Sequence, residues 1–170
     1  DERHPCQALT DLLTIQESLG TLKNVKPVFV GDGNNVAMSL AIASAMAGMK
    51  MTLAAPKGFE FSNMFLKGLS KRYPNHHVNQ VHSATDAVKS ADIVYTDVWA
   101  SMGQEEDAVR RMKAFADFQV NEELMKAAPK DARFMHDLPA KRGFEVTDGV
   151  MDGSQSIVFQ QAENRMHLAR

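Results

Sequence analysis

Short apolar runs alternate with segments of helical periodicity along this chain, and no other feature of the sequence constrains the fold as strongly. The segments that predict strands lie at residues 26–30, 51–56, 79–84, 91–99 and 132–136. Strands of continuous apolar character that alternate with helices are typical of a parallel sheet covered on both faces. The sequence therefore predicts an α/β fold, with a doubly wound parallel sheet of about five strands, helices on both faces and right-handed crossovers.

The segments between these runs carry the signals of helices. After His4, apolar residues recur at helical spacing, Pro5 suits a first turn and Gly20 is placed to end the helix. Residues 34–49 are apolar on nearly every side, which predicts a buried helix. The remaining helices are expected around Phe61, Phe65 and Leu69, over residues 84–91, along Val109, Met112 and Phe115 to about Ala116, over residues 121–128, and from Gln160 to Arg170.

Composition indicates one domain without a strongly charged partner. The chain has 170 residues, 44% of them hydrophobic, which is enough for a single packed core. Its 19 basic and 21 acidic residues nearly cancel, so we expect neither a nucleic acid nor a membrane surface as partner. The single cysteine, Cys6, excludes an internal disulfide and fits a reducing compartment such as the cytoplasm. The longest apolar run, residues 37–49, is too short to span a bilayer.

Three histidines raise the question of a metal site. His76, His77 and His82 flank an expected strand in a polar stretch, and no carboxylate or cysteine stands at a convincing ligand spacing from them. A solvated loop accounts for them better. We therefore expect no metal, and the sequence indicates no other cofactor.

Four polar loops follow the expected strands and mark the place where a ligand would bind. In doubly wound sheets, ligands bind beyond the carboxyl ends of the strands, near the point where the strand order reverses. The loops at that edge are GDGNN, APKGFE, TDVWASMGQEE and HDLPAKRG, at residues 31–35, 55–60, 96–106 and 136–143. Their density of polar groups suits a small polar ligand.

Each motif has a structural interpretation beside the functional one. GDGNN lacks the third glycine of a dinucleotide-binding turn, and it could be a plain turn with Asn35 as a helix cap. Asp97 at a strand end could grip a ligand ammonium, or the loop after it could begin a helix that Ser101 caps. AENRMH, residues 162–167, could be an exposed helix with ion pairs.

Six motifs occur together and in a fixed order: HPCQALTDLLTI, GDGNNVAMS, PKGFE, YTDVWASMGQEE, HDLPAKRGFEVTDGV and SIVFQQAENRMH. Together they resemble ornithine carbamoyltransferase, over essentially all 170 residues. The resemblance implies that residues 1–170 form the ornithine-binding domain and that residues 1–20 form an interdomain helix. It also implies a preceding domain with a Ser-Thr-Arg-Thr-Arg phosphate loop, a homotrimer for the full-length enzyme, and two substrates, carbamoyl phosphate and L-ornithine.

The resemblance also implies roles for individual residues. The carbamoyl half of carbamoyl phosphate would be held by His4, Gln7, the backbone of Leu138 and Arg165. The amino-acid end of ornithine would be held by Asn35, Asp97, Ser101 and the backbone at Met102. Arg165 and His4 would stabilise the oxyanion that forms when the δ-amine attacks the carbonyl carbon, a contribution that usually dominates in acyl-type transfer.

The sequence departs from the family at one motif, because it has HDLP where HCLP is usual. Asp137 thus stands near the expected position of the δ-amine, as a third catalytic candidate beside Arg165 and His4. A carboxylate can orient the amine, yet it also stabilises the unreactive ammonium form. With an ordinary pKa of about 3.9 it would be a poor base near neutrality unless burial raised that value.

Two alternatives stay open. One is a related transcarbamylase for another amine, such as acetylornithine or putrescine; the other is a non-enzymatic ligand-binding domain with this fold. Under the leading hypothesis the whole enzyme makes L-citrulline in arginine biosynthesis or the urea cycle, in the cytoplasm or the mitochondrial matrix. The 170 residues alone are expected to be inactive, because the phosphate loop is absent from them.

Overall fold

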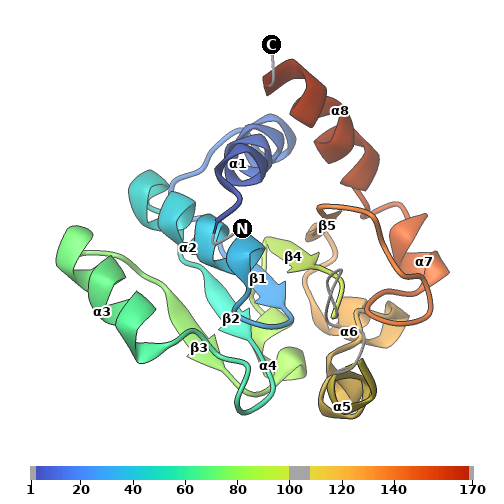
Figure 1. Cartoon of the computed structure of the whole chain (residues 1–170). Coiled ribbons are helices and arrows are strands. Elements are labelled where there is room, and N and C mark those ends of the chain that lie inside the picture. Colours follow the sequence, from blue (N-terminus) through green and yellow to red (C-terminus); the bar gives the residue numbers. More distant parts are fainter. Residues whose placement is uncertain (1–2, 100–107, 169–170) are drawn as a thin grey trace.

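A five-stranded parallel sheet forms the centre of the molecule. The computed structural model describes residues 3–99 and 108–168 (Figure 1). The strands lie in the order β3-β2-β1-β4-β5, and every neighbouring pair is parallel. Their bounds are β1 Pro27–Val30, β2 Thr52–Ala54, β3 Asn79–Val81, β4 Ile93–Thr96 and β5 Arg133–His136. The predicted doubly wound α/β fold is therefore confirmed.

Helices connect the strands and cover both faces of the sheet. They are α1 Pro5–Leu19, α2 Asn35–Ala47, α3 Asn63–Arg72, α4 Ala84–Val88, α5 Ala108–Ala114, the 3₁₀ helix η2 Ala116–Phe118, α6 Glu122–Ala127, α7 Asp148–Met151 and α8 Val158–Leu168. As predicted, Pro5 opens α1, and Gly20 ends it in the left-handed conformation (φ 74°). The sequence did not predict α7 or η2, which have only four and three residues.

The helix α5 corrects one detail of the prediction. Val109 and Met112 were expected to line its apolar side, yet they are 66% and 47% exposed. Phe115, just beyond the helix, is fully buried and stacks on Trp99 with 5.7 Å between ring centroids. The hydrophobic contact that anchors this segment is therefore made by the residue after the helix, not by a stripe along it.

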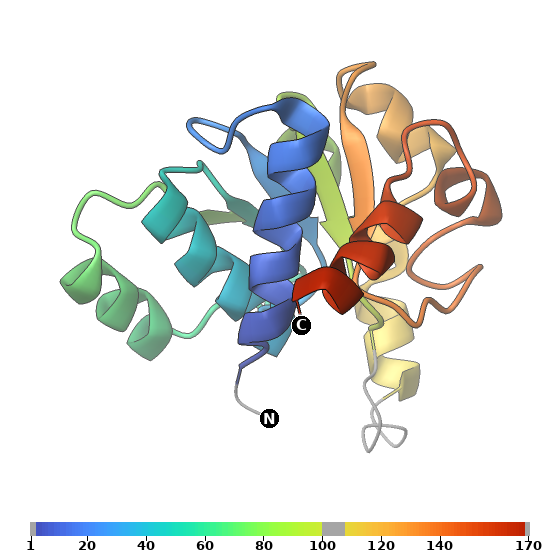
Figure 2. The same cartoon turned by 90° about the horizontal axis from the view of Figure 1, so that it is seen from above.

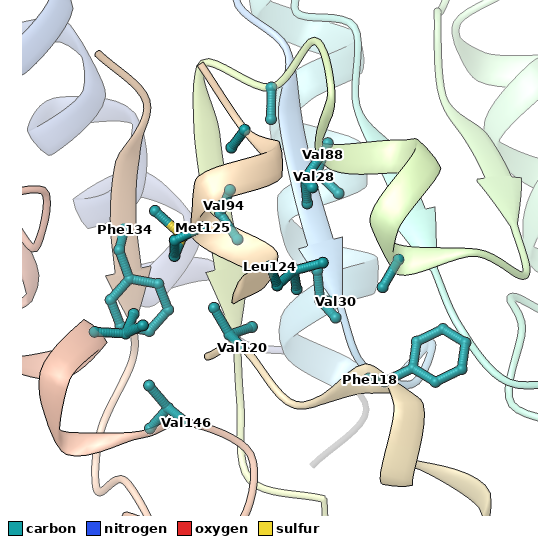
Figure 3. Close-up of a cluster of buried hydrophobic side chains, with 14 of the residues drawn as sticks. Val28, Val30, Val88, Val94, Phe118, Val120, Leu124, Met125, Phe134 and Val146 are labelled. Carbon is teal, nitrogen blue, oxygen red and sulfur yellow. The ribbon is translucent and has the colours of Figure 1, made fainter. Parts of the chain in front are cut away.

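Alternation along each strand divides the core into two layers. Val28, Val94 and Phe134 point to one face, where side chains of α4, α6 and α7 cover them (Figure 3). Their neighbours Phe29 and Tyr95 point to the other face, beneath α1, α2 and α3, and stack at 5.2 Å. Because both faces are covered, the central strands β1 and β4 are buried along their whole length, as the sequence indicates.

The helices α1 and α8 lie side by side above the second face (Figure 2). Asn164 of α8 donates hydrogen bonds to Thr14 Oγ1 (3.0 Å) and Glu17 Oε2 (2.7 Å) of α1. Segments 150 residues apart in the sequence are thus joined by a buried hydrogen bond between Asn164 and Thr14. Among residues 3–99 and 108–168, no helix has the length and apolarity needed to cross a membrane.

Candidate functional site

Three strand ends place the predicted polar loops side by side. Val30 of β1 pairs with Thr96 of β4, and Thr96 pairs with His136 of β5. The strands β1 and β4 are sheet neighbours, although β2 and β3 lie between them in the sequence. The chain thus crosses to the other side of β1 after β3, which makes the gap between these two strand ends the expected ligand position.

The turn after β1 reaches across to β4. Asn34 caps α2, since its Oδ1 accepts a hydrogen bond from Ala37 N (2.9 Å), and its Nδ2 donates to Asp97 Oδ2 (2.7 Å). The cap is therefore Asn34 and not Asn35, which is the first residue of the helix. Gly33 is required by space, because a Cβ there would lie 2.9 Å from the backbone nitrogen of Phe61.

Two carboxyl groups meet at the ends of β4 and β5. Asp97 is 8% exposed and also accepts a hydrogen bond from Val98 N at 2.6 Å. The side chain of Asp137 is likewise 8% exposed, and its Oδ1 has no hydrogen-bond partner among the described residues. One carboxyl oxygen of Asp97, one of Asp137 and one ring nitrogen of His136 lie within 4.8 Å of one another. Burial, and then the neighbouring Asp97 carboxylate, raise the pKa of Asp137 to about 9.

His136 is fully buried and holds the HDLP turn in place. Its Nδ1 accepts a hydrogen bond from Leu138 N (2.9 Å), so Nε2 carries the proton and donates to Glu145 Oε1 (3.2 Å). Both ring nitrogens are thus engaged, which leaves neither for a metal ion. Leu138 has a left-handed backbone (φ 59°), and the bond to Pro139 is cis. The amide of Leu138 serves His136, and its carbonyl is the backbone group left for a ligand.

A buried polar network links Arg165 to the sheet. Arg165 Nη1 donates to Gln7 Oε1 (3.0 Å), and Gln7 Nε2 donates to Asp11 Oδ1 (2.9 Å). The same Asp11 oxygen accepts hydrogen bonds from Gln161 Nε2 (2.7 Å) and Tyr95 OH (3.3 Å). Gln161 Oε1 accepts the backbone N–H of His136 at 3.0 Å. Helices α1 and α8 are thereby tied to β4 and β5 at the place where the candidate site lies.

Asp11 was not among the predicted site residues. It is fully buried, and burial raises its pKa to about 7, although hydrogen bonds from Gln7, Gln161 and Tyr95 act in the opposite direction. The sequence did hold a signal, because Asp11 falls between Ala8 and Ile15 on the face of α1 that is buried. A carboxyl group is rarely placed on the buried face of a helix unless it has partners.

His4 lies close to both Arg165 and Asp97. Its backbone N–H donates to Ser39 Oγ of α2 (2.8 Å). Burial first, and then the Arg165 cation, lower the pKa of the imidazole, while Asp97 acts in the opposite direction. These opposing influences place His4 near both Arg165 and Asp97, and favour a neutral ring at pH 7.

A cavity of about 520 Å³ opens beside β5. Its lining includes four of the predicted site residues, Gln7, Asp137, Leu138 and Arg165. Asp97 is not part of the lining, but one of its carboxyl oxygens lies within 4.8 Å of an oxygen of Asp137. Asn35 is half-buried at the start of α2 and is not part of the lining. Ser101 and Met102 lie outside the described residues.

An ion pair that the sequence did not predict supports the loop after β1. Arg111 Nη1 of α5 donates to Asp32 Oδ2 (2.6 Å) and to the Trp99 carbonyl (2.8 Å). The side chains of Arg111 and Asp32 are only 12% and 15% exposed. Burial raises the pKa of Asp32, and the Arg111 guanidinium opposes that change. The pair joins the GDGNN turn to Trp99, just after the end of β4.

The fold and the site define a class of protein: a doubly wound α/β domain that can hold a small, charged ligand at the carboxyl ends of its parallel strands. The chain belongs to the aspartate/ornithine carbamoyltransferase family, because residues 23–170 match the family model of the Asp/Orn binding domain. This finding agrees with the resemblance indicated by the sequence motifs.

Individual relatives support the same assignment. The whole chain is 51% identical to the anabolic ornithine carbamoyltransferase of Pyrococcus furiosus and 50% identical to the ornithine carbamoyltransferase of Geobacillus stearothermophilus, and covers 55% of each. A solved structure of ornithine carbamoyltransferase from Pyrococcus furiosus superposes with a TM-score of 0.92 at 50% identity, over 99% of this chain and 54% of that one. The chain thus spans about half the length of the relatives it matches.

Proposed function

We propose that this chain is the ornithine-binding part of an ornithine carbamoyltransferase, which makes L-citrulline and phosphate from carbamoyl phosphate and L-ornithine. One observation carries the proposal. At the ends of β4 and β5, acceptors for an amine stand beside a cavity whose lining also includes Arg165 and Gln7, polar groups suited to a carbamoyl group and phosphate. The names of the relatives favour ornithine over acetylornithine or putrescine.

The roles of the residues are those that the resemblance to the family implies, and the chemistry of the groups supports them. Asp97 binds the α-ammonium of ornithine through a charge-assisted hydrogen bond, and Asn35 donates to its α-carboxylate. Ser101 and the backbone at Met102 also bind this amino-acid end of ornithine. Asp137 orients the δ-amine toward the carbamoyl carbon.

Other residues of the cavity hold the carbamoyl group. The Gln7 amide, the Leu138 carbonyl and Arg165 bind it, and attack by the neutral δ-amine gives a tetrahedral intermediate with an oxyanion. Arg165 and the neutral imidazole of His4 donate hydrogen bonds to that oxyanion before phosphate departs. Gln7 already accepts a hydrogen bond from Arg165, which fixes the guanidinium in position before the substrate arrives.

In the assembled enzyme, a further domain supplies the phosphate loop, and the 170 residues alone do not form citrulline. We also propose the homotrimer and the role in arginine metabolism, in the cytoplasm or the mitochondrial matrix, that this family assignment implies.

Calorimetric titration with L-ornithine, and with putrescine as the control, tests the proposal. Ornithine should bind, whereas putrescine, which lacks the α-carboxylate, should bind at least tenfold more weakly. Asp97→Asn should weaken ornithine binding at least tenfold, because the variant loses the charge that pairs with the α-ammonium. The matched change Asp131→Asn, at an exposed residue before β5 and thus beyond the opposite end of that strand from the site, should leave binding unchanged. Equal affinity for both ligands would contradict the proposal.

A further inference from the structure

The carboxyl pair Asp97–Asp137 differs from an ordinary pair of acidic side chains, because both groups are largely buried. Asp97 as a residue and the side chain of Asp137 are each 8% exposed, at the ends of neighbouring strands. Asp97 is supplied with donors, from Asn34 Nδ2 and Val98 N, whereas Asp137 Oδ1 has none among the described residues. Two adjacent buried carboxylates with one of their oxygens unsatisfied are costly unless a proton or a cation joins them.

We infer that the Asp97–Asp137 pair holds one proton in the ligand-free protein and exchanges it for the side-chain ammonium of the amino-acid ligand. This inference rests on the proposed function. Before binding, the pair has one proton and a charge of −1. After binding, both groups are carboxylates: Asp97 faces the α-ammonium, Asp137 faces the side-chain ammonium, and the proton has gone to solvent. Atoms and charge balance without any other reactant.

The surroundings of the pair favour the same exchange. The pKa of Asp137, about 9, is raised mainly by burial, then by the charge of the neighbouring Asp97, and also by the charge of Asp11. Tyr95 also faces the pair, and its own pKa is raised well above the ordinary value. The further titratable or charged groups around the pair are His136 on β5, Asp32 after β1 with its partner Arg111, His4 before α1, and Arg165 on α8.

The exchange has a chemical consequence for the amine. An ordinary lysine-type ammonium has a pKa of about 10.4, close to the raised value of Asp137. The difference in pKa between the ammonium and Asp137 is therefore smaller than it would be for an exposed carboxyl group, so moving a proton to Asp137 to leave the neutral amine that attack requires costs less free energy. Asp137, which would be a poor base if it were exposed to water, is thus a better base at this buried position.

Proton release on binding is the direct test. L-Ornithine is titrated calorimetrically at pH 7.5 in two buffers with different ionisation enthalpies, and L-norvaline, which lacks only the δ-amine, is the matched ligand. About one proton should be released per ornithine and almost none per norvaline. Between pH 6.5 and 8.5, the ornithine affinity should rise by about tenfold per pH unit, as linkage requires for one released proton.

The variant Asp137→Asn keeps the shape but cannot hold the proton, so it should abolish proton release and flatten the pH dependence. Asp131→Asn, an exposed carboxyl far from the pair, should behave as the unchanged protein. Ornithine binding without proton release, or release that persists in Asp137→Asn, would overturn the exchange and leave the proposed function intact. Absence of ornithine binding would overturn both. Carboxyl ¹³C NMR of the ligand-free protein should give Asp137 an apparent pKa above 7, and an ordinary value near 4 would overturn the exchange regardless of binding.

Discussion

The two faces of the central sheet bury different chemistry. On one face, Val28, Val94 and Phe134 pack against apolar side chains of α4, α6 and α7 (Figure 3). On the other face, Tyr95 lies in an apolar layer too, but its hydroxyl meets Asp11 in a network of fully buried polar groups. The first face needs only complementary shape and volume. The second needs each donor to meet its acceptor, and it is the face from which Arg165 and Gln7 reach the candidate site.

The apolar face should give the largest loss of stability. Phe134→Ala removes a fully buried ring and leaves a cavity, so the free energy of unfolding should fall by about 3–5 kcal/mol. Urea denaturation measures the change. The control Phe144→Ala alters a side chain that is 43% exposed, so its effect should be much smaller. A loss below about 1 kcal/mol for Phe134→Ala would mean that this layer repacks freely.

The polar face should lose somewhat less stability when its acceptor is removed. Asp11→Ala leaves Gln7, Gln161 and the Tyr95 hydroxyl without their shared acceptor, which should cost about 2–4 kcal/mol. The same variant should weaken carbamoyl phosphate binding in the assembled enzyme, because Gln7 no longer fixes Arg165. Gln16→Ala, at an exposed site on the same helix, is the control. Unchanged stability in Asp11→Ala would show that the network is dispensable.

The two faces should also differ in their response to pH. Asp11 and Asp137 have folded-state pKa values of about 7 and about 9, above the ordinary 3.8. Between pH 3.8 and the raised pKa of each group, the folded chain therefore holds more protons than the unfolded chain. Their contribution to stability is therefore complete below about pH 4 and is lost as the pH rises toward 7 and 9.

Two variants separate these contributions. Asp137→Asn should raise the free energy of unfolding at pH 8 by about 1–2 kcal/mol and much less at pH 5, since it removes a group that is costly to ionise. Asp11→Asn should instead reduce the decrease in the free energy of unfolding between about pH 4 and 7. Thermal denaturation across this range provides the measurement. Phe134→Ala should lower the whole pH profile without changing its shape, and a changed shape would contradict the separation of the faces.

The smallest effect is expected outside both faces. Arg142 forms ion pairs with Asp148 and Asp152 at 2.7 and 2.6 Å, but its side chain is 39% exposed. Because exposed ion pairs contribute little, Arg142→Ala should shift Tm by less than about 2 °C. A larger shift would show that these pairs, rather than burial, hold the HDLP loop in place.

The sequence predicted the sheet because local patterns are sufficient for it. The strand β4 is buried along its whole length, and Pro5 and Gly20 marked the ends of α1 in the sequence. The four loops at the strand ends followed from the rule for parallel sheets, and three of them meet as expected. The carboxyl group of Asp137 was recognised in the sequence as the departure from the family motif.

Other features escaped prediction because they depend on contacts between distant residues. The Asn34 cap and the exposed Val109 are local errors, made where two asparagines compete and where a helix ends one residue before its buried aromatic ring. The Asp32–Arg111 pair joins residues 79 positions apart, and no local pattern indicates such a partner.

The sequence by itself determined the α/β class, the family and the edge of the sheet where the ligand loops gather, since apolar periodicity and glycine-bearing turns act over a few residues. Only the tertiary structure decided the ionisation state of Asp137 and the partners of Asp11. Burial and neighbouring charge set the pKa of Asp137, and the hydrogen bond from Gln161 to Asp11 spans 150 residues. Both properties arise only when α1, β4, β5 and α8 have packed together.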